Sequence, residues 1–78
     1  MARLRLFGPA REAAGTATIT LPGRSVSEII ASAEEQFGVA FSQVVAVSNI
    51  WLNGESVPPD TQVVDDDEVA VIPPVSGG

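Results

Sequence analysis

The sequence predicts an α+β domain in which a mixed sheet of four to five strands packs against one main helix. Residues 2–7 alternate between two sets of side chains, as a half-buried strand does. Residues 26–37 carry a single apolar stripe at helical spacing. Residues 69–72 are four consecutive apolar residues, which is typical of a strand buried on both faces. The 78 residues suffice for one such domain with one small core.

The N-terminal third predicts a hairpin. In the first strand, residues 2–7, Ala2, Leu4 and Leu6 share one face. A break at Gly8-Pro9 and a short connection of about one helical turn, residues 10–15, lead to a second strand over residues 16–21.

A capping box formed by Ser25 and Glu28 predicts the start of the main helix, and Gly38 is placed to end it. The apolar stripe between these signals consists of Val26, Ile29, Ile30, Ala33 and Phe37. Residues 39–45 give an ambiguous pattern, which we interpret as a short irregular turn under the sheet.

The C-terminal half predicts three more strands. Residues 46–52 form the third strand, Asn53-Gly54 is a strong hairpin turn, and residues 55–57 form a short edge strand that Pro58-Pro59 protects from further pairing. The last strand, residues 69–72, and the first are the most apolar and should be parallel central neighbours. This order of elements predicts a ubiquitin-like β-grasp fold.

Composition limits the chemistry that the chain can perform. It contains no cysteine, histidine, tyrosine or lysine, so it lacks a thiol nucleophile, an ordinary general base near neutral pH and a zinc-type ligand set. No catalytic side chain and no metal site are therefore expected. The acidic run Asp65-Asp66-Asp67-Glu68 lacks the spacing of a calcium loop and is interpreted as a solvated turn.

The net charge of −6 argues against binding to nucleic acid or to anionic membranes and favours a partner with a basic surface. No apolar run reaches the length of a membrane span, and the N-terminus has no signal pattern. We therefore expect a cytoplasmic location.

The ending of the chain is its most informative feature. Pro73 and Pro74 stop the last strand and favour an extended form that leads away from the sheet. Residues 1–74 are thus predicted to be the folded domain, and residues 75–78 a flexible tail that ends in Gly77 and Gly78. Glycine has no side chain to obstruct a narrow channel. If the protein takes part in chemistry, the reacting group should be the carboxylate of Gly78, with a partner supplying the catalysis.

Over nearly its whole length the chain resembles the small subunit of molybdopterin synthase and its relatives, the MoaD/ThiS-like ubiquitin-like sulfur carriers. The resemblance is carried by Phe7 with Ala10-Arg11-Glu12, by Leu52-Asn53-Gly54, by Asp67-Glu68-Val69-Ala70 and above all by Pro73-Pro74-Val75-Ser76-Gly77-Gly78. The chain departs from the family at Asp66, where glycine is usual, and at Trp51, where the family tends to carry a small or aliphatic residue. Asp tolerates a left-handed backbone, so the turn at Asp66 should survive.

The resemblance implies a function for the tail. An E1-like adenylating enzyme would use ATP to activate Gly78, and a sulfur donor protein would convert it to a thiocarboxylate. The large subunit of molybdopterin synthase would then pass the sulfur to a pterin precursor of the molybdenum cofactor. The chain itself is expected to bind no cofactor.

The family docks its partners through the open face of the sheet, near the tail. If the helix covers the face of Leu4, then Phe7, Trp51 and Ile72 should share the open face, with Arg5 beside them to pair with an acidic group of the partner. The alternative is that Trp51 belongs to the core. The residues expected to bind partners are Phe7, Arg5, Arg11, Trp51, Ile72, Pro73, Pro74, Val75 and Ser76.

Other functions remain open at this point. The sulfur could serve thiamine thiazole synthesis, cysteine synthesis or tRNA thiolation. The chain could instead be a ubiquitin-like modifier that joins Gly78 to lysines of target proteins, or an interaction module with a passive tail. Because it has no lysine, it cannot form lysine-linked chains with itself.

Overall fold

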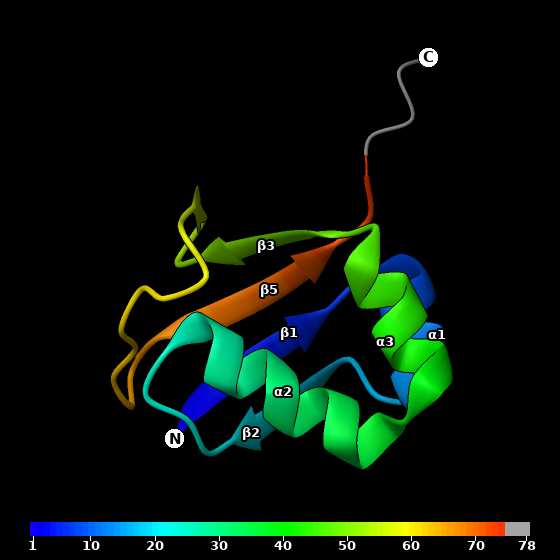
Figure 1. Ribbon diagram of the computed structural model, residues 1–78, viewed down its shortest axis with the longest axis horizontal. Coiled ribbons are helices and arrows are strands. Elements are labelled where there is room, and N and C mark those ends of the chain that lie inside the picture. Colours follow the sequence, from blue (N-terminus) through cyan, green and yellow to red (C-terminus); the bar gives the residue numbers. More distant parts are fainter. Residues whose placement is uncertain (75–78) are drawn as a thin grey trace.

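The computed structural model describes residues 1–74, so the predicted tail of residues 75–78 lies outside the described residues. Five strands and three helices follow one another along this part of the chain (Figure 1). In order they are β1 (Ala2–Leu6), α1 (Gly8–Ala14), β2 (Thr18–Leu21), α2 (Val26–Phe37), α3 (Val39–Ala46), β3 (Asn49–Leu52), β4 (Glu55–Ser56) and β5 (Glu68–Ile72). The predicted α+β class and the mixed sheet packed on one main helix are confirmed.

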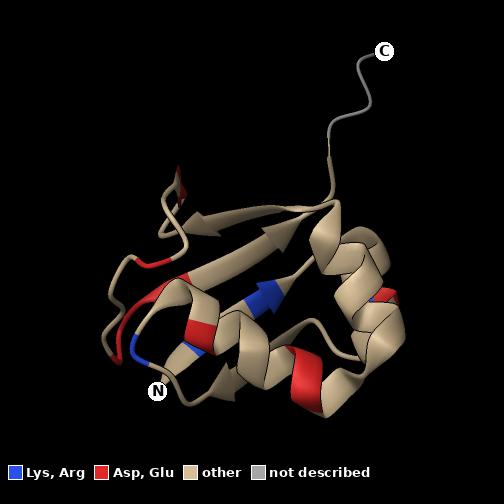
Figure 2. Cartoon of the chain, viewed as in Figure 1, with Lys and Arg blue, Asp and Glu red and all other residues tan. Residues whose placement is uncertain are grey.

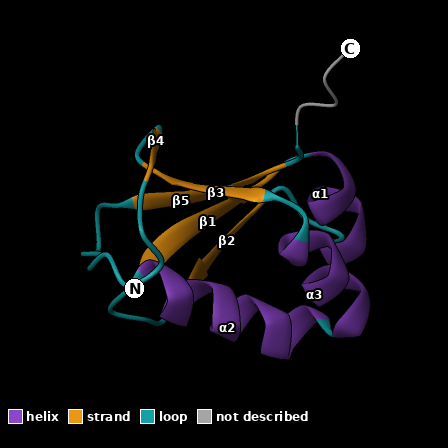
Figure 3. Ribbon diagram, turned by 45° about the horizontal axis from the view of Figure 1, so that its top comes forward, coloured by secondary structure: helices purple, strands orange, loops and turns teal. Residues whose placement is uncertain are grey.

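The strands form a single sheet in the order β2-β1-β5-β3-β4. β1 is antiparallel to β2 and parallel to β5, and β3 is antiparallel to both β4 and β5. The first and last strands are therefore the parallel central neighbours that the sequence predicts. Helix α2 lies across one face of the sheet, while α1 and α3 lie together near one of its ends (Figures 1 and 3).

The core lies between the sheet and α2. Leu4, Val69 and Val71 of the central strands are fully buried, as are Ile29 and Ala33 of α2. Burying a Leu, Ile or Val side chain contributes roughly 1.5–3 kcal/mol each. These residues hold the helix on one face, so the opposite face of the sheet is left open.

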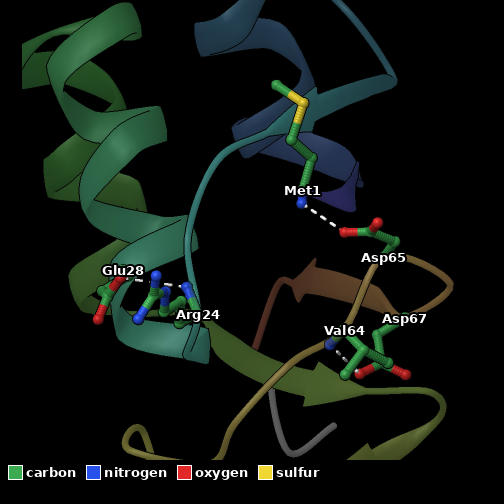
Figure 4. A network of polar contacts seen from close by, with 6 residues as sticks. All are labelled: Met1, Arg24, Glu28, Val64, Asp65 and Asp67. Atoms are coloured by element: carbon green, nitrogen blue, oxygen red, sulfur yellow. Dashed lines mark hydrogen bonds and ion pairs between the residues drawn. The ribbon is translucent and has the colours of Figure 1, made fainter.

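The start of α2 agrees with the predicted capping box, with one change of partner. The hydroxyl Oγ of Ser25 accepts a hydrogen bond of 3.2 Å from the backbone N–H of Glu28. The carboxylate of Glu28 accepts a bond of 3.1 Å from the N–H of Arg24, rather than from that of Ser25 (Figure 4). The bond to Ser25 satisfies one of the N–H donors that a helix start leaves unpaired, and the bond to Glu28 holds the residue that precedes the cap.

Two predicted connections are in fact helices. Of the predicted connection 10–15, residues 10–14 belong to α1, which is longer than the single turn expected, and Gly15 is its C-cap. Residues 39–45 lie in α3 instead of forming an irregular turn. Phe41 of α3 is fully buried, and its ring centroid lies 5.2 Å from that of Phe37. The helix is thus stabilised by tertiary packing, which overrides the low helix propensity of its valines.

Several strand boundaries also differ from the prediction. β3 begins at Asn49 rather than at residue 46, because the N–H groups of Val47 and Ser48 bond the carbonyls of Val44 and Val45 and prolong the end of α3. β2 begins at Thr18 rather than at residue 16, and β4 ends at Ser56 rather than at residue 57. In β5 only one face is buried, so the prediction of burial on both faces is wrong: Val69 and Val71 are buried, whereas Ala70 and Ile72 remain partly exposed.

Candidate docking face and tail base

The open face of the sheet brings together residues of the three strands β1, β5 and β3. Ala70 of β5 pairs with Trp51 of β3 on one side and with Arg5 of β1 on the other. Asn49 pairs with Ile72, and strand alternation puts Ile72 on the same face as Ala70. Trp51 is 38% exposed. Trp51 therefore belongs to the open face, and the alternative that places it in the core is wrong.

Phe7 completes this surface. Leu6 pairs with Val71, and the N–H of Phe7 continues the pairing with a bond of 3.3 Å to the carbonyl of Val71. Phe7 therefore lies beside Ile72 in the next register position of the parallel pair, and Phe7 is 41% exposed. We call the surface made by Phe7, Trp51, Ala70 and Ile72 the open-face patch. Exposed apolar patches of this kind commonly mark interaction sites.

Charged residues border the open-face patch. The carboxylate of Glu68 lies 3.5 Å from the guanidinium of Arg3 and 3.6 Å from that of Arg5. The guanidinium carbon of Arg5 also lies 5.8 Å from the centroid of the Phe7 ring, within cation–π range. Arg5 thus has an acidic partner within its own chain. Exposed ion pairs contribute only about 0–1 kcal/mol to stability, so Arg5 can readily exchange Glu68 for another acidic partner.

The base of the tail lies beside the start of α1. Gly8 has a φ of +55°, and a Cβ at this position would stand 3.4 Å from Cγ of Pro73. The first turn of α1 therefore rests against Pro73 where the chain leaves the sheet (Figure 1). Arg11 is exposed on α1, three residues after Gly8, and Pro74 is exposed beyond Pro73.

Hydrogen bonds connect two of the motifs that carry the family resemblance, Leu52-Asn53-Gly54 and Asp67-Glu68-Val69-Ala70. The N–H of Asn53 donates to the carbonyl of Glu68 over 2.8 Å, and its Oδ1 accepts from the N–H of Glu68 over 2.9 Å. Its Nδ2 donates to Oδ1 of Asp67 over 2.9 Å. Oδ2 of Asp67 in turn accepts a bond of 2.8 Å from the N–H of Val64 (Figure 4). The sequence analysis used these motifs for the resemblance and for two turns, but it did not predict the contact between them.

These hydrogen bonds also explain why the pKa of Asp67 is lowered. The bond from the backbone N–H of Val64, and secondly that from the amide of Asn53, lower the pKa of Asp67 below its ordinary value. Both donors favour the charged form of the carboxylate.

The acidic run has separate structural partners rather than a common ligand. Asp65 accepts a bond of 2.7 Å from the amino group of Met1 (Figure 4), Asp67 binds Asn53, and Glu68 faces the two arginines. Within residues 1–74 no three His, Cys, Asp or Glu side chains are grouped as metal ligands. The left-handed residue near this turn is Asn53, since it alone of the described non-glycine residues has a positive φ. Asp66 therefore does not have to adopt a left-handed backbone conformation.

The remaining predicted site residues, Val75, Ser76, Gly77 and Gly78, lie outside the described residues. The structure brings Phe7, Arg5, Trp51, Ile72 and Pro73 to one side and one end of the sheet.

A central parallel pair of first and last strands, one helix across the sheet and an exit through Pro73 and Pro74 define a ubiquitin-like β-grasp protein. Residues 4–78 match the model of the ThiS family. The chain therefore belongs to this family of ubiquitin-like sulfur carriers and modifiers. No curated protein sequence matches it significantly.

Solved structures of similar proteins agree with this assignment. The small archaeal modifier protein 1 of Methanosarcina acetivorans is 29% identical, with a TM-score of 0.88 over 99% of this chain and 95% of that one. A putative subunit 1 of the molybdopterin converting factor from Pyrococcus furiosus is 30% identical, with a TM-score of 0.80 over 95% of this chain and 97% of that one. One chain of the complex between subunits 1 and 2 of the molybdopterin-converting factor from Helicobacter pylori shares the fold at 24% identity, with a TM-score of 0.75 over 99% of this chain and 97% of that one.

Proposed function

We propose that this protein carries sulfur as a thiocarboxylate on Gly78 and donates it to a pterin precursor in molybdopterin biosynthesis. The observation that carries the proposal is the extent of the family match, which runs from residue 4 to residue 78 and so includes the Gly-Gly ending. The Pro-Pro-Val-Ser-Gly-Gly ending supports the molybdopterin branch, as does the likeness to the putative converting factor subunit from Pyrococcus furiosus.

The proposed chemistry needs no side chain of this protein as a catalyst. A terminal carboxyl group has a pKa of about 3.5, so it is an anion at neutral pH and a poor electrophile. An E1-like enzyme would join this carboxylate to AMP at the expense of ATP. A sulfur donor protein would then form a C–S bond at the acyl carbon, and the C–O bond to AMP would break. Pyrophosphate leaves in the first step and AMP in the second. If the donor carries the sulfur as a persulfide, a thiol reductant would then cleave the S–S bond to the donor and release the Gly78 thiocarboxylate.

The open-face patch is the proposed docking surface for both the E1-like enzyme and the synthase large subunit. Trp51 provides a large aromatic side chain of the type that dominates binding energy at interfaces. Arg5 and Arg11 would pair with acidic groups of the partner. Pro73, Pro74, Val75 and Ser76 would lead the chain from this surface into the active site of the partner. In Helicobacter pylori a complex of the two converting-factor subunits has been solved.

The second candidate function is covalent modification of other proteins. It is favoured by the likeness to the small archaeal modifier protein 1. A modifier would use the same activated Gly78, but an amine of the target would take the place of sulfur as the nucleophile. We place either function in the cytoplasm, and among residues 1–74 no helix is long and apolar enough to cross a membrane.

Intact-mass measurement of the protein purified from its native cells tests the proposal. Replacement of one C-terminal oxygen by sulfur is the expected result. Lysine adducts of the chain on other proteins, without any sulfur-loaded form, would favour the modifier instead. Deleting the gene then separates the sulfur destinations, because loss of molybdenum-enzyme activity is expected, whereas a requirement for thiamine or cysteine would contradict the molybdopterin branch.

A further inference from the structure

The helix-covered face of the sheet is not completely closed. Leu4 and Val71 on this face are fully buried, whereas Ile50 and Leu52 of β3 point to the same face and remain partly exposed. The strand order explains the difference in exposure. Helix α2 packs toward β2 at one edge of the sheet, whereas β3 lies beyond β5, toward the other edge. A hollow of about 220 Å³ remains between α2 and β3.

The walls of this hollow are mostly apolar. They are formed by Val26, Ile30, Ile50, Val57 and Pro59. The polar groups in the lining come from Ser27 and Glu34 of α2. Ligand sites commonly combine an apolar lining with a few polar groups that orient the ligand. We call this hollow the α2–β3 pocket.

Two backbone hydrogen bonds fix one wall of the pocket. The N–H of Ser27 donates to the carbonyl of Pro59 over 2.8 Å, and the N–H of Val26 donates to the carbonyl of Thr61 over 2.9 Å. These bonds use donors of the first turn of α2 that would otherwise lack a partner. They fix Pro59 and Thr61 against the first turn of the helix, so this wall of the pocket is in place before any ligand arrives.

The charge at the pocket is negative. Glu34 supplies the one charged side chain of the lining, and it has no ion pair among residues 1–74. Acidic residues are also distributed along α2 and the connection before β5 (Figure 2). A cation placed beside an apolar group would therefore complement the pocket in both charge and polarity.

We propose that the α2–β3 pocket is a second docking site, for a segment of a partner protein that inserts an apolar side chain and sets an adjacent Arg or Lys against Glu34. The pocket lies on the face of the sheet opposite the open-face patch. A partner could thus hold the protein here while the open face and the tail are engaged elsewhere. The site stands on its own geometry and does not require the proposed sulfur chemistry.

A titration of the whole protein with a minimal probe, N-acetyl-leucyl-arginine amide, tests this site by ¹H–¹⁵N NMR. Shifts are expected at Val26, Ile30, Ile50 and Val57. The charge-reversed probe, N-acetyl-leucyl-glutamate amide, should bind more weakly. Glu34→Gln should weaken binding of the arginine probe about threefold, the size expected for one partly exposed ion pair.

Glu35→Gln is the matched control, because it removes the same charge from the next position of α2. Glu35 lines a different hollow, beside Pro22 and Gly23, so this variant should bind the arginine probe as the unchanged protein does. Shifts that concentrate at the open-face patch would overturn the proposal. Equal losses in the two variants, or equal binding of the two probes, would also overturn it, since either result would mean general charge attraction only.

Discussion

Asn53 and Asp67 are joined side chain to side chain, with Nδ2 of Asn53 donating to Oδ1 of Asp67 over 2.9 Å. The two residues are 14 positions apart and stand at the two ends of the connection that links β3 to β5 through β4. Asn53 also has a φ of 49°, a left-handed value that asparagine adopts more readily than most residues. Asn53 thus serves the turn through its backbone conformation, and its side chain joins the two ends of the connection.

Asn53→Gly should separate these two roles. Glycine accepts the left-handed backbone but removes the bonds to Asp67 and to the N–H of Glu68. We expect the free energy of unfolding, measured in urea, to fall by about 1–2 kcal/mol. Asn53→Ala loses the same bonds and adds backbone strain, so it should be less stable than the glycine variant. Equal stability of Asn53→Gly and the unchanged protein would show that the side-chain bonds contribute nothing.

The lowered pKa of Asp67 predicts a specific acid sensitivity. Because the folded protein holds the carboxylate ionised more strongly than the unfolded chain does, the extra stability is present above the unfolded pKa of about 3.9. It is lost as the pH falls through the lower folded pKa. Urea unfolding from about pH 6 to about pH 2 should therefore show a smaller decline in Asp67→Asn than in the unchanged protein.

Asp66→Asn is the control for this measurement, since within residues 1–74 the Asp66 side chain makes no hydrogen bond or ion pair. It should keep the full decline in stability at low pH. If Asp67→Asn keeps it as well, the contacts with Val64 and Asn53 do not govern the acid response.

Trp51→Ser tests the open-face patch. Because the indole lies on the open face, we expect the free energy of unfolding to fall by only about 1 kcal/mol. Affinity for the activating enzyme or the synthase large subunit should weaken by about 2 kcal/mol or more, measured by calorimetry. Leu4→Ala, a fully buried position, should show the reverse pattern, with a stability loss of about 2–5 kcal/mol. Undiminished partner affinity in Trp51→Ser would remove the patch from the interface.

Deleting Gly78, or replacing Gly77 by leucine, should abolish sulfur loading by the activating enzyme. The first change leaves the terminal carboxylate on Gly77, one residue short of the position on which the activating enzyme would act, and the second adds a side chain to a tail that would have to pass through a narrow channel. The core residues of the described part of the chain lie between Ala2 and Val71, so we expect urea unfolding to match that of the unchanged protein. Sulfur loading of the Gly78-deleted protein, followed by intact mass, would refute the proposed mechanism.

Gly8 and Gly15 offer a matched pair for testing the base of the tail. Both have positive φ, but a Cβ at Gly15 meets nothing within 4 Å, whereas one at Gly8 meets Pro73. Alanine at either site should cost about 1 kcal/mol through backbone strain. Leucine at Gly8 should cost more than leucine at Gly15 and should also reduce sulfur loading, because it displaces Pro73. If the two leucine variants affect stability and sulfur loading equally, Gly8 has no role in positioning Pro73 at the base of the tail.

Local signals in the sequence determined several elements of this protein directly. Alternation fixed the faces of β1, because successive side chains of a strand point to opposite sides. Ser25 and Glu28 located the start of α2, and Asn53-Gly54 located the hairpin. Each of these signals acts within a few residues, so no knowledge of distant contacts was needed.

The tertiary structure alone decided what depends on contacts between distant residues. α1 and α3 are short helices that persist because Ala10 and Phe41 are buried in a common core, which local propensity does not register. Alternation predicted that the side chains of Trp51 and Ile50 point to opposite faces of the sheet. Only the position of α2 determined which of these two faces stays open. The bond between Asn53 and Asp67 and the incomplete cover over β3 likewise arise from how separate elements pack, and packing is a property of the whole chain.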